Sequence, residues 1–469
     1  MTSPLQGPPI DADALHAALD HHAQATPATV REILDRAREL KGLDDQDVAV
    51  LLAASDRELD EEIFQAAREV KETIYGNRLV LFAPLYITNK CQNECRYCAF
   101  RASNRALLRR NLTQEEIAHE TRVIIDEGHK RILLVAGESY PAGEGLDYVY
   151  RAIETIYGVK SGNGEIRRLN VNVAALDVEH YRRLHACGIG TYQLFQETYH
   201  RPTYAHMHLA GPKSDYDWHI GAMDRAMTAG IDDVGIGVLF GLYDWRFEVL
   251  AMMHHARHLE DRFGVGPHTI SVPRIEPAEG SAVALNPPHA VRDRDFLRLI
   301  AILRLAVPYT GIILSTRENA TIRRQCYALG ISQISASSRT NPGGYAESQQ
   351  DGHSGSQFSL GDHRSLDEVI ADCLELGFLP SFCTACYRKG RTGADFMDLA
   401  RPGLIKEYCQ PNAILTVKEY LEDYASPETR ALGEQTIARS VEAIEQDGLR
   451  CDVCDRLVKI EDGTRDLHY

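Results

Sequence analysis

Residues 91–100 read Cys-Gln-Asn-Glu-Cys-Arg-Tyr-Cys-Ala-Phe, which places three thiols within eight residues in the spacing C-x3-C-x2-C. The stretch comes just after the strand-like run 83–88. Four cysteines usually hold a [4Fe–4S] cube, so three thiolates on one loop can hold three of its irons and leave the fourth without a protein ligand. Such an iron can bind a small molecule and pass an electron into it. We expect the rest of the chain to serve this loop.

A zinc knuckle or a redox thiol pair is the alternative interpretation of these cysteines. Zinc would need a fourth ligand close by, usually from a second paired motif, and the nearest histidine in sequence is His119. A motif of three spaced thiols is also more specific than a single C-x2-C pair. The spacing therefore favours an iron–sulfur cluster.

The same stretch resembles the signature of the radical S-adenosylmethionine (SAM) enzymes, including the aromatic Phe100 two places after the last cysteine. The resemblance implies that Cys91, Cys95 and Cys98 hold a catalytic, SAM-cleaving cluster. It further implies that the amino and carboxylate groups of SAM chelate the open iron. An electron from the cluster would then split the sulfonium and release a 5′-deoxyadenosyl radical.

Composition limits the classes of protein that this chain can belong to. With 469 residues, 44% of them hydrophobic, it can bury a large core. A net charge of −16 makes a nucleic-acid partner unlikely, and no apolar run approaches the ~20 residues that span a bilayer. Residues 1–20 lack an apolar signal core, and the 11 cysteines cluster in short motifs, as in a reducing cytosol. We expect a cytoplasmic protein.

Helix-spaced apolar residues fill the first 78 residues, which we expect to form a helical cover over one end of a barrel. From residue 79 the pattern alternates between strand and helix, and residues 113–116 form a capping box for one of the helices. We predict three regions: the helical extension 1–78, a barrel over 79–340 and a mainly helical domain over 341–469.

Eight strand-like runs separated by helices predict an α/β fold, a parallel (β/α)8 barrel of the TIM type. An incomplete six-stranded barrel is the main alternative. The predicted runs are 83–88, 131–136, 168–174, 191–196, 233–240, 268–272, 311–315 and 332–336.

Polar residues follow several of these runs, where a barrel places its chemistry. In radical SAM enzymes a Gly-Gly-Glu-like turn after the second strand receives the amino group of SAM. Residues 136–139, Ala-Gly-Glu-Ser, resemble this turn, so Glu138 and Ser139 are candidate SAM contacts. Glu197 is a second candidate acceptor, for the ribose hydroxyls.

A second set of three thiols follows a Gly-, Ser- and Asn-rich segment, 340–361, that reads as a loop or linker. Cys383 and Cys386 form a C-x2-C pair, and 22 residues separate Cys386 from Cys409. Three thiols again predict a cube with one unclaimed iron. Zinc with a distant fourth ligand is the alternative.

The two motifs together resemble the family of tyrosine lyases that mature [FeFe]-hydrogenase. Residues 195–200, 272–274, 315–318 and 409–413 extend the resemblance over nearly the whole chain. It implies that the first cluster initiates cleavage of L-tyrosine at the Cα–Cβ bond, giving p-cresol and dehydroglycine. The C-terminal cluster would convert dehydroglycine into carbon monoxide and cyanide on a fifth iron, building an Fe(CO)2CN unit that also carries a cysteine ligand.

The same resemblance makes His268 a candidate ligand of the fifth iron, and neutral imidazole suits iron. Arg317 and Arg323 are candidates to bind the carboxylate of tyrosine, and Arg274 could share that role or contact SAM. The implied partners are a reductant protein such as ferredoxin or flavodoxin and other hydrogenase maturation factors.

Two alternatives remain open at this point. The 2-iminoacetate synthase of thiamine biosynthesis resembles this barrel and also cleaves tyrosine, but its family lacks the C-terminal cysteine motif. A non-catalytic iron–sulfur or zinc scaffold is the other. The pair Cys451 and Cys454 departs from the hydrogenase-maturation family and could bind metal, form a disulfide or be exposed bystanders.

Overall fold

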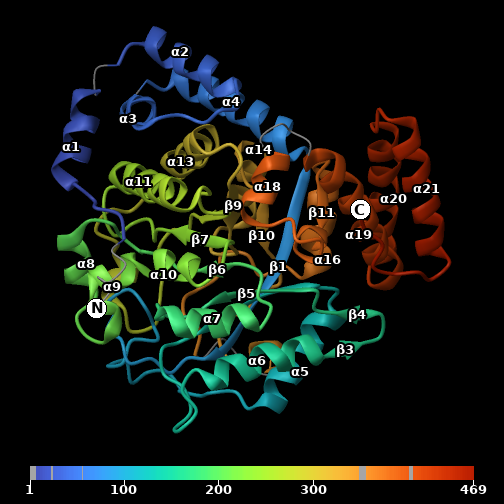
Figure 1. The fold of residues 1–469 in the computed structure, drawn as a ribbon, viewed down its shortest axis with the longest axis horizontal. Helices are drawn as coiled ribbons and strands as arrows, with labels where there is room; N and C mark the ends of the chain where they lie inside the picture. The colour runs from blue at the N-terminus through green and yellow to red at the C-terminus, as the bar shows by residue number, and fades with distance from the viewer. Residues whose placement is uncertain (1–6, 23–24, 55, 348–354, 401–404) are drawn as a thin grey trace.

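The computed structural model describes residues 7–22, 25–54, 56–347, 355–400 and 405–469. Eight parallel strands form a closed barrel, because β10 pairs with β1 (Figure 1). This confirms the (β/α)8 prediction and excludes the six-stranded alternative. The barrel strands are β1 (Arg78–Thr88), β2 (Arg131–Ala136), β5 (Arg168–Asn172), β6 (Tyr192–Gln193), β7 (Val234–Gly237), β8 (Thr269–Ser271), β9 (Gly311–Leu314) and β10 (Gln333–Ser335).

The helices between the strands form the outer layer of the barrel. The predicted capping box is present, since Thr113 and Glu116 bond each other's backbone N–H at the start of α5. The stretch from Asp215 to Gly230 forms two short helices that meet at Gly221. The outer helices are α5 (Gln114–Asp126), α6 (Asp147–Gly158), α7 (Val178–Ala186), α8 (Arg201–Met207), α9 (Tyr216–Ile220), α10 (Ala222–Thr228), α11 (Trp245–Phe263), α12 (Ala282–Leu285), α13 (Asp293–Ala306) and α14 (Ala320–Leu329).

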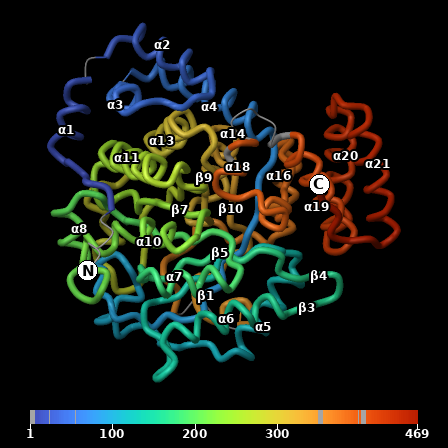
Figure 2. The backbone as a smooth tube through the Cα atoms, viewed as in Figure 1, coloured from blue at the N-terminus to red at the C-terminus, as the bar shows by residue number. Residues whose placement is uncertain are grey.

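Four N-terminal helices pack against the outer helices α11, α13 and α14, so the cover lies along the side of the barrel. Figure 2 shows these helices and the last two helices of the chain at separate edges of the molecule. The N-terminal helices are α1 (Ala12–His21), α2 (Pro27–Arg38), α3 (Asp45–Ala53) and α4 (Glu58–Tyr75).

The C-terminal region is mainly helical, but it also adds a ninth strand, β11 (Leu379–Ser381), that the sequence pattern did not predict. β11 pairs with the first three residues of β1, Arg78 to Val80, and β10 pairs with the next part of the strand, Val80 to Phe82. Its Pro380 has no N–H to donate, as is typical of an edge strand. The pairing attaches the C-terminal region to the amino end of the barrel.

The remaining elements of the C-terminal region are α15 (Gly344–Glu347), α16 (Leu366–Glu375), α17 (Ala385–Arg388), α18 (Gly393–Ala400), α19 (Ile405–Asp423), α20 (Pro427–Glu442) and α21 (Asp447–Glu461). Of the predicted loop 340–361, residues 348–354 lie outside the described residues, and α15 replaces part of the rest. The sequence pattern also gave no sign of the hairpin β3 (Lys160–Ser161) and β4 (Gly164–Glu165). In the described part of the chain, every helix is too short or too polar to cross a membrane.

Candidate active site and metal centres

A cavity of about 230 Å³ fills the barrel interior and reaches the loops at the carboxyl ends of the strands. Cys91, Cys95 and Cys98 all line it, together with the predicted Phe100, Glu138, Glu197 and Arg317. Parallel strands that close into a barrel bring the loops after different strands to one face. Residues up to 276 positions apart in sequence, Phe82 and Phe358, therefore share this cavity.

The three thiols of the first motif have surroundings that fit a cluster. The amide nitrogen of Asn93 lies 3.6 Å from the sulfur of Cys91, and that of Gln357 lies 3.7 Å from the sulfur of Cys98. Amide N–H donors stabilise sulfur that carries negative charge, as cluster-bound thiolate does. Among the residues that the structure describes, no three Cys, His, Asp or Glu side chains converge to hold a single metal ion. The amide donors beside two of the three sulfurs fit thiolates bound to a cluster.

Burial raises the pKa of the Cys95 thiol, and it raises the pKa of Cys98 to about 11. Without metal both groups therefore hold their protons at neutral pH. Cluster binding must release these protons, because iron binds thiolates.

The turn after β2 places Glu138 at the cavity next to the cysteine loop. A Cβ atom on Gly137 would lie 2.3 Å from the carbonyl oxygen of Lys90, so only glycine fits there. The Asn93 amide donates to Oε2 of Glu138 at 2.6 Å, and burial raises the pKa of this carboxyl. Ser139, by contrast, is not among the residues lining the cavity.

Glu197 stands at the cavity in a left-handed backbone conformation, with φ of 68°. Its Oε1 accepts from Nζ of Lys213 at 2.7 Å. Lys213 comes from a short 3-10 turn, Pro212–Ser214, that carries no sequence signal of function. The sequence reasoning therefore missed this cation, which balances a carboxylate beside the cysteine loop.

Glu248 on α11 fixes the segment that carries Glu197. Its carboxylate accepts a hydrogen bond from the hydroxyl of Thr198 and another, at 2.9 Å, from the backbone N–H of Tyr199. Burial raises the pKa of Glu248 from 4.5 to about 8. The folded state thus holds a proton that the unfolded chain releases, so the free energy of unfolding falls as pH rises through this window.

We expect Glu248→Gln to flatten this pH dependence, since glutamine has no proton to lose. In the wild type, this group should change the free energy of unfolding by on the order of a few kcal/mol between pH 5 and 8, and the variant should lack that change. Thermal unfolding of both proteins across this range measures it, with Glu115→Gln on the exposed face of α5 as the control. Parallel curves for the wild type and Glu248→Gln would contradict the assignment.

The three candidate arginines occupy different environments. Arg317 lines the cavity, stacks on the ring of Phe358 and has no ion-pair partner among the described residues. Arg323 pairs with Asp362 at 2.9 Å, and Arg274 donates to Glu318 and, at 2.8 Å, to Asp293. Neither Arg274 nor Arg323 lines the cavity. Of the three candidate arginines, Arg317 is the one whose guanidinium reaches the cavity.

A second, smaller cavity of about 50 Å³ lies at the amino ends of the barrel strands. Cys383, Cys386, Cys409 and His268 line it together. β11 delivers the C-x2-C pair there because Cys383 follows the strand by two residues, and α19 supplies Cys409. Pro411 interrupts the hydrogen bonds of α19 two residues beyond that cysteine.

His268 lies at this cavity with a partner at each ring nitrogen. The hydroxyl of Tyr387 lies 3.0 Å from its Nε2, and Asp233 lies 3.3 Å from its Nδ1. Burial lowers the pKa of His268, which keeps the imidazole neutral. A neutral imidazole can bind iron.

The thiols of the second motif influence each other. Cys386 lowers the pKa of Cys409 to about 6 by hydrogen bonding, and Arg78 and Arg391 add to the effect. The pKa of Cys386 is raised in turn by Cys409. Cys409 is therefore the first of these buried thiols to ionise.

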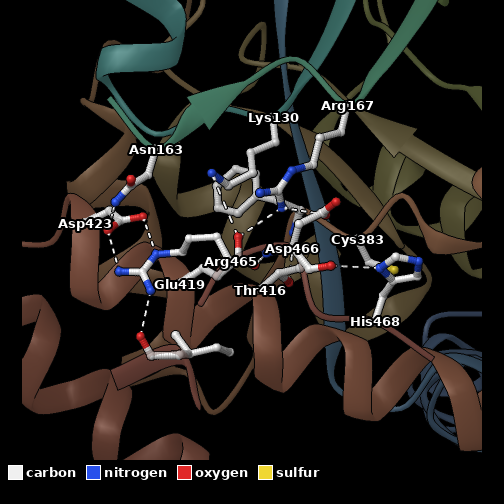
Figure 3. A network of polar contacts seen from close by, with 12 residues as sticks. Lys130, Asn163, Arg167, Cys383, Thr416, Glu419, Asp423, Arg465, Asp466 and His468 are labelled. Carbon is white, nitrogen blue, oxygen red and sulfur yellow. Dashed lines mark hydrogen bonds and ion pairs between the residues drawn. The ribbon is translucent and has the colours of Figure 1, made fainter. Parts of the chain in front are cut away.

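A polar network fixes α19 against the barrel (Figure 3). Arg167 donates to the buried Glu419 at 2.9 Å, and Lys130 lies 4.0 Å from the same carboxylate. In the C-terminal tail, Arg465 pairs with Asp423 at 2.7 Å and Asp466 lies 3.1 Å from Arg167. Because α19 carries Cys409, these contacts determine where that ligand stands.

The other cysteines lie outside both cavities. Cys326 and Cys373 are buried in the core, and Cys187 is half-buried at the end of α7. Cys451 and Cys454 are exposed on α21. A role for Cys451 and Cys454 in metal binding or in a disulfide stays a prediction.

Comparison with known proteins gives two family matches, the radical SAM superfamily over residues 85–254 and the biotin and thiamin synthesis associated domain over 271–379. A crystal structure of HydG, a maturase of the [FeFe]-hydrogenase, is 50% identical, with a TM-score of 0.94 over 98% of this chain and 99% of that one. HydG from Carboxydothermus hydrogenoformans is 40% identical, with a TM-score of 0.83 over 95% and 97%. The 2-iminoacetate synthase of Escherichia coli (strain K12) is 33% identical over 74% of this chain and 89% of its own.

Proposed function

The chain belongs to the radical SAM superfamily and, within it, to the HydG family of [FeFe]-hydrogenase maturases, and from this premise we propose a two-site reaction. The first site cleaves L-tyrosine at the Cα–Cβ bond into p-cresol and dehydroglycine. The second converts dehydroglycine into carbon monoxide and cyanide and builds an Fe(CO)2CN unit for the hydrogenase cofactor. Free cysteine is a ligand of the product iron.

The observation that carries this proposal is a pair of three-cysteine sites at opposite ends of one barrel. A closed barrel interior excludes water, which protects a radical from side reactions. A small fragment released in the upper cavity is enclosed by the same strands that line the lower one. The geometry suits two linked reactions.

In the upper site, Cys91, Cys95 and Cys98 would hold the first [4Fe–4S] cluster. When bound, this cluster supplies the electron that cleaves SAM. Glu138 accepts from the ammonium of SAM, Glu197 from its ribose hydroxyls, and Phe100 packs beside the loop. Arg317 binds the carboxylate of tyrosine through its free N–H groups.

In the lower site, Cys383, Cys386 and Cys409 would hold a second [4Fe–4S] cluster. His268 would bind the fifth iron, which leaves as part of the product. Asp233 would orient this imidazole through Nδ1, as groups around a metal-binding histidine commonly do, and Tyr387 would have to leave Nε2 for iron to bind there.

A 2-iminoacetate synthase is the second candidate, favoured by the likeness to the Escherichia coli enzyme. That likeness covers 348 residues, whereas the HydG structures cover 95–98% of the chain. The lower cavity and its cysteines favour hydrogenase maturation. A non-catalytic scaffold would not need a guanidinium and a carboxyl at a cavity, as Arg317 and Glu138 provide.

We expect roughly eight irons per chain after anaerobic reconstitution, or nine with the fifth iron, against about four for a protein with one cluster. Iron and sulfide analysis measures this. The reconstituted protein, mixed with SAM, tyrosine and dithionite, should release p-cresol and carbon monoxide. Absence of p-cresol would refute the lyase, and p-cresol without carbon monoxide would indicate the thiamine activity.

A further inference from the structure

The loop around the first cysteine triplet has a surface unlike the rest of the chain. Residues 90–113 contain six lysines and arginines and one acid, in a chain whose net charge is −16. The acidic total conceals this local positive charge. A basic patch on an acidic protein marks a site for a partner of opposite charge.

Exposed leucines stand on the segments that adjoin this loop. Leu108, Leu209 and Leu285 are 77%, 58% and 63% exposed, and they are three of the five large apolar side chains exposed in the described part of the chain. Apolar side chains flanked by charge are typical of protein–protein contact surfaces.

Hydrogen bonds place all three leucines around the cysteine loop. The backbone N–H of Leu209 donates to the carbonyl of Glu94 at 3.0 Å, and the carbonyl of Leu108 accepts from the Asn89 amide at 2.8 Å. Leu285 ends α12, whose first turn is tied to the loop by Ser281, which donates to the carbonyl of Arg96 at 2.7 Å.

Much of the positive charge is not neutralised by an acid among the described residues. Arg109 donates only to backbone carbonyls, and neither Lys90 nor Arg105 has an ion-pair partner among the described residues. Arg96 contacts His206 rather than a carboxylate. Three acids lie nearby: Glu94 is paired with Arg101, and Glu116 and Glu347 are paired with Arg110. Glu279 is exposed beside Asn104, and its single charge does not balance the patch.

We propose that this surface, the cluster-loop face (Lys90, Arg96, Arg105 and Arg109 with Leu108, Leu209 and Leu285), docks a reduced ferredoxin. The inference rests on the proposed function, which needs a low-potential electron at the site beneath this face. A ferredoxin is a small acidic protein with its cluster near its surface. One electron leaves the ferredoxin, which is oxidised, and enters the site held by Cys91, Cys95 and Cys98, which is reduced; no covalent bond changes in this step.

The two kinds of side chain have separate tasks in this proposal. Free arginines attract the acidic partner and set its orientation, and their effect weakens as salt screens it. The leucines supply the apolar centre that is desolvated on contact. Binding therefore depends on both charge and apolar area.

The test uses the cluster-loaded full chain and a reduced [2Fe–2S] ferredoxin, with the dissociation constant measured by calorimetry at low and high salt. The double variant Arg105→Glu/Leu285→Asp should weaken binding by at least about tenfold, since like charges face each other across the contact. Lys459→Glu/Val458→Asp on α21 makes the same change of charge on another exposed surface and should leave binding unchanged. Wild-type binding should weaken with salt.

Dithionite bypasses docking, so both double variants should form p-cresol at the wild-type rate with this reductant. Equal dissociation constants for the two double variants would overturn the docking face. Binding of a flavodoxin but not of ferredoxin at this face would overturn the choice of partner. A wild-type protein that binds ferredoxin but forms no p-cresol would refute the proposed function and leave the docking face supported.

Discussion

Cys386→Ala is expected to form p-cresol at close to the wild-type rate while losing carbon monoxide. Cys386 lines only the lower cavity, and the upper cavity with its own three cysteines is built from other residues. Removing one of three thiolates leaves the second cluster without a full ligand set. Carbon monoxide should fall by at least the roughly 100-fold that loss of a supporting group alone can cost a metal site.

Both products come from one incubation with SAM, tyrosine and dithionite, with cresol measured by chromatography and carbon monoxide trapped by deoxyhaemoglobin. Cys451→Ala, an exposed thiol on α21, is the matched control and should keep both products. Iron content should drop to roughly four per chain in Cys386→Ala alone. Equal loss of cresol and carbon monoxide in Cys386→Ala would refute the division of labour between the cavities.

Arg317→Gln should lower kcat/KM for tyrosine by about 10- to 100-fold, mostly through KM. A hydrogen bond to a charged group contributes about 1.5–3 kcal/mol, and each 1.4 kcal/mol is a factor of ten. The guanidinium stacks on Phe358 in the cavity without a carboxylate of its own, so its N–H groups are free for substrate. Arg317→Lys keeps the charge but loses the two-pronged geometry, so its kcat/KM for tyrosine should lie between those of the wild type and Arg317→Gln.

Arg323→Gln is the contrasting variant. Arg323 is fully buried and pairs with Asp362, so its loss leaves that carboxylate with Arg364 alone and should lower the melting temperature. The KM of the Arg323→Gln variant for tyrosine should stay near the wild-type value. A raised KM in Arg323→Gln with none in Arg317→Gln would reverse the assignment.

Local patterns predicted most of the barrel from the sequence. All eight predicted strand ranges contain a strand or overlap one, because buried parallel strands read as continuous apolar runs. The capping box at Thr113 depends on residues three positions apart, so it too is visible in sequence. Both cysteine triplets were found because their spacing is short and specific.

The features that sequence did not predict depend on contacts between distant segments. β11 has only three residues and includes Pro380, so its pairing with Arg78 to Val80 is decided by β1 and not by its own pattern. The roles of the three arginines likewise depend on partners elsewhere, such as Asp362 for Arg323. Lys213 is a lone lysine until the fold places it against Glu197.

β11 has a consequence for any attempt to shorten this protein. Removing the C-terminal region would strip the hydrogen-bonding partner from the first residues of β1 and leave an unprotected strand edge on a hydrophobic barrel. Such edges recruit other chains and promote aggregation. A shortened protein should therefore lose solubility as well as the lower site.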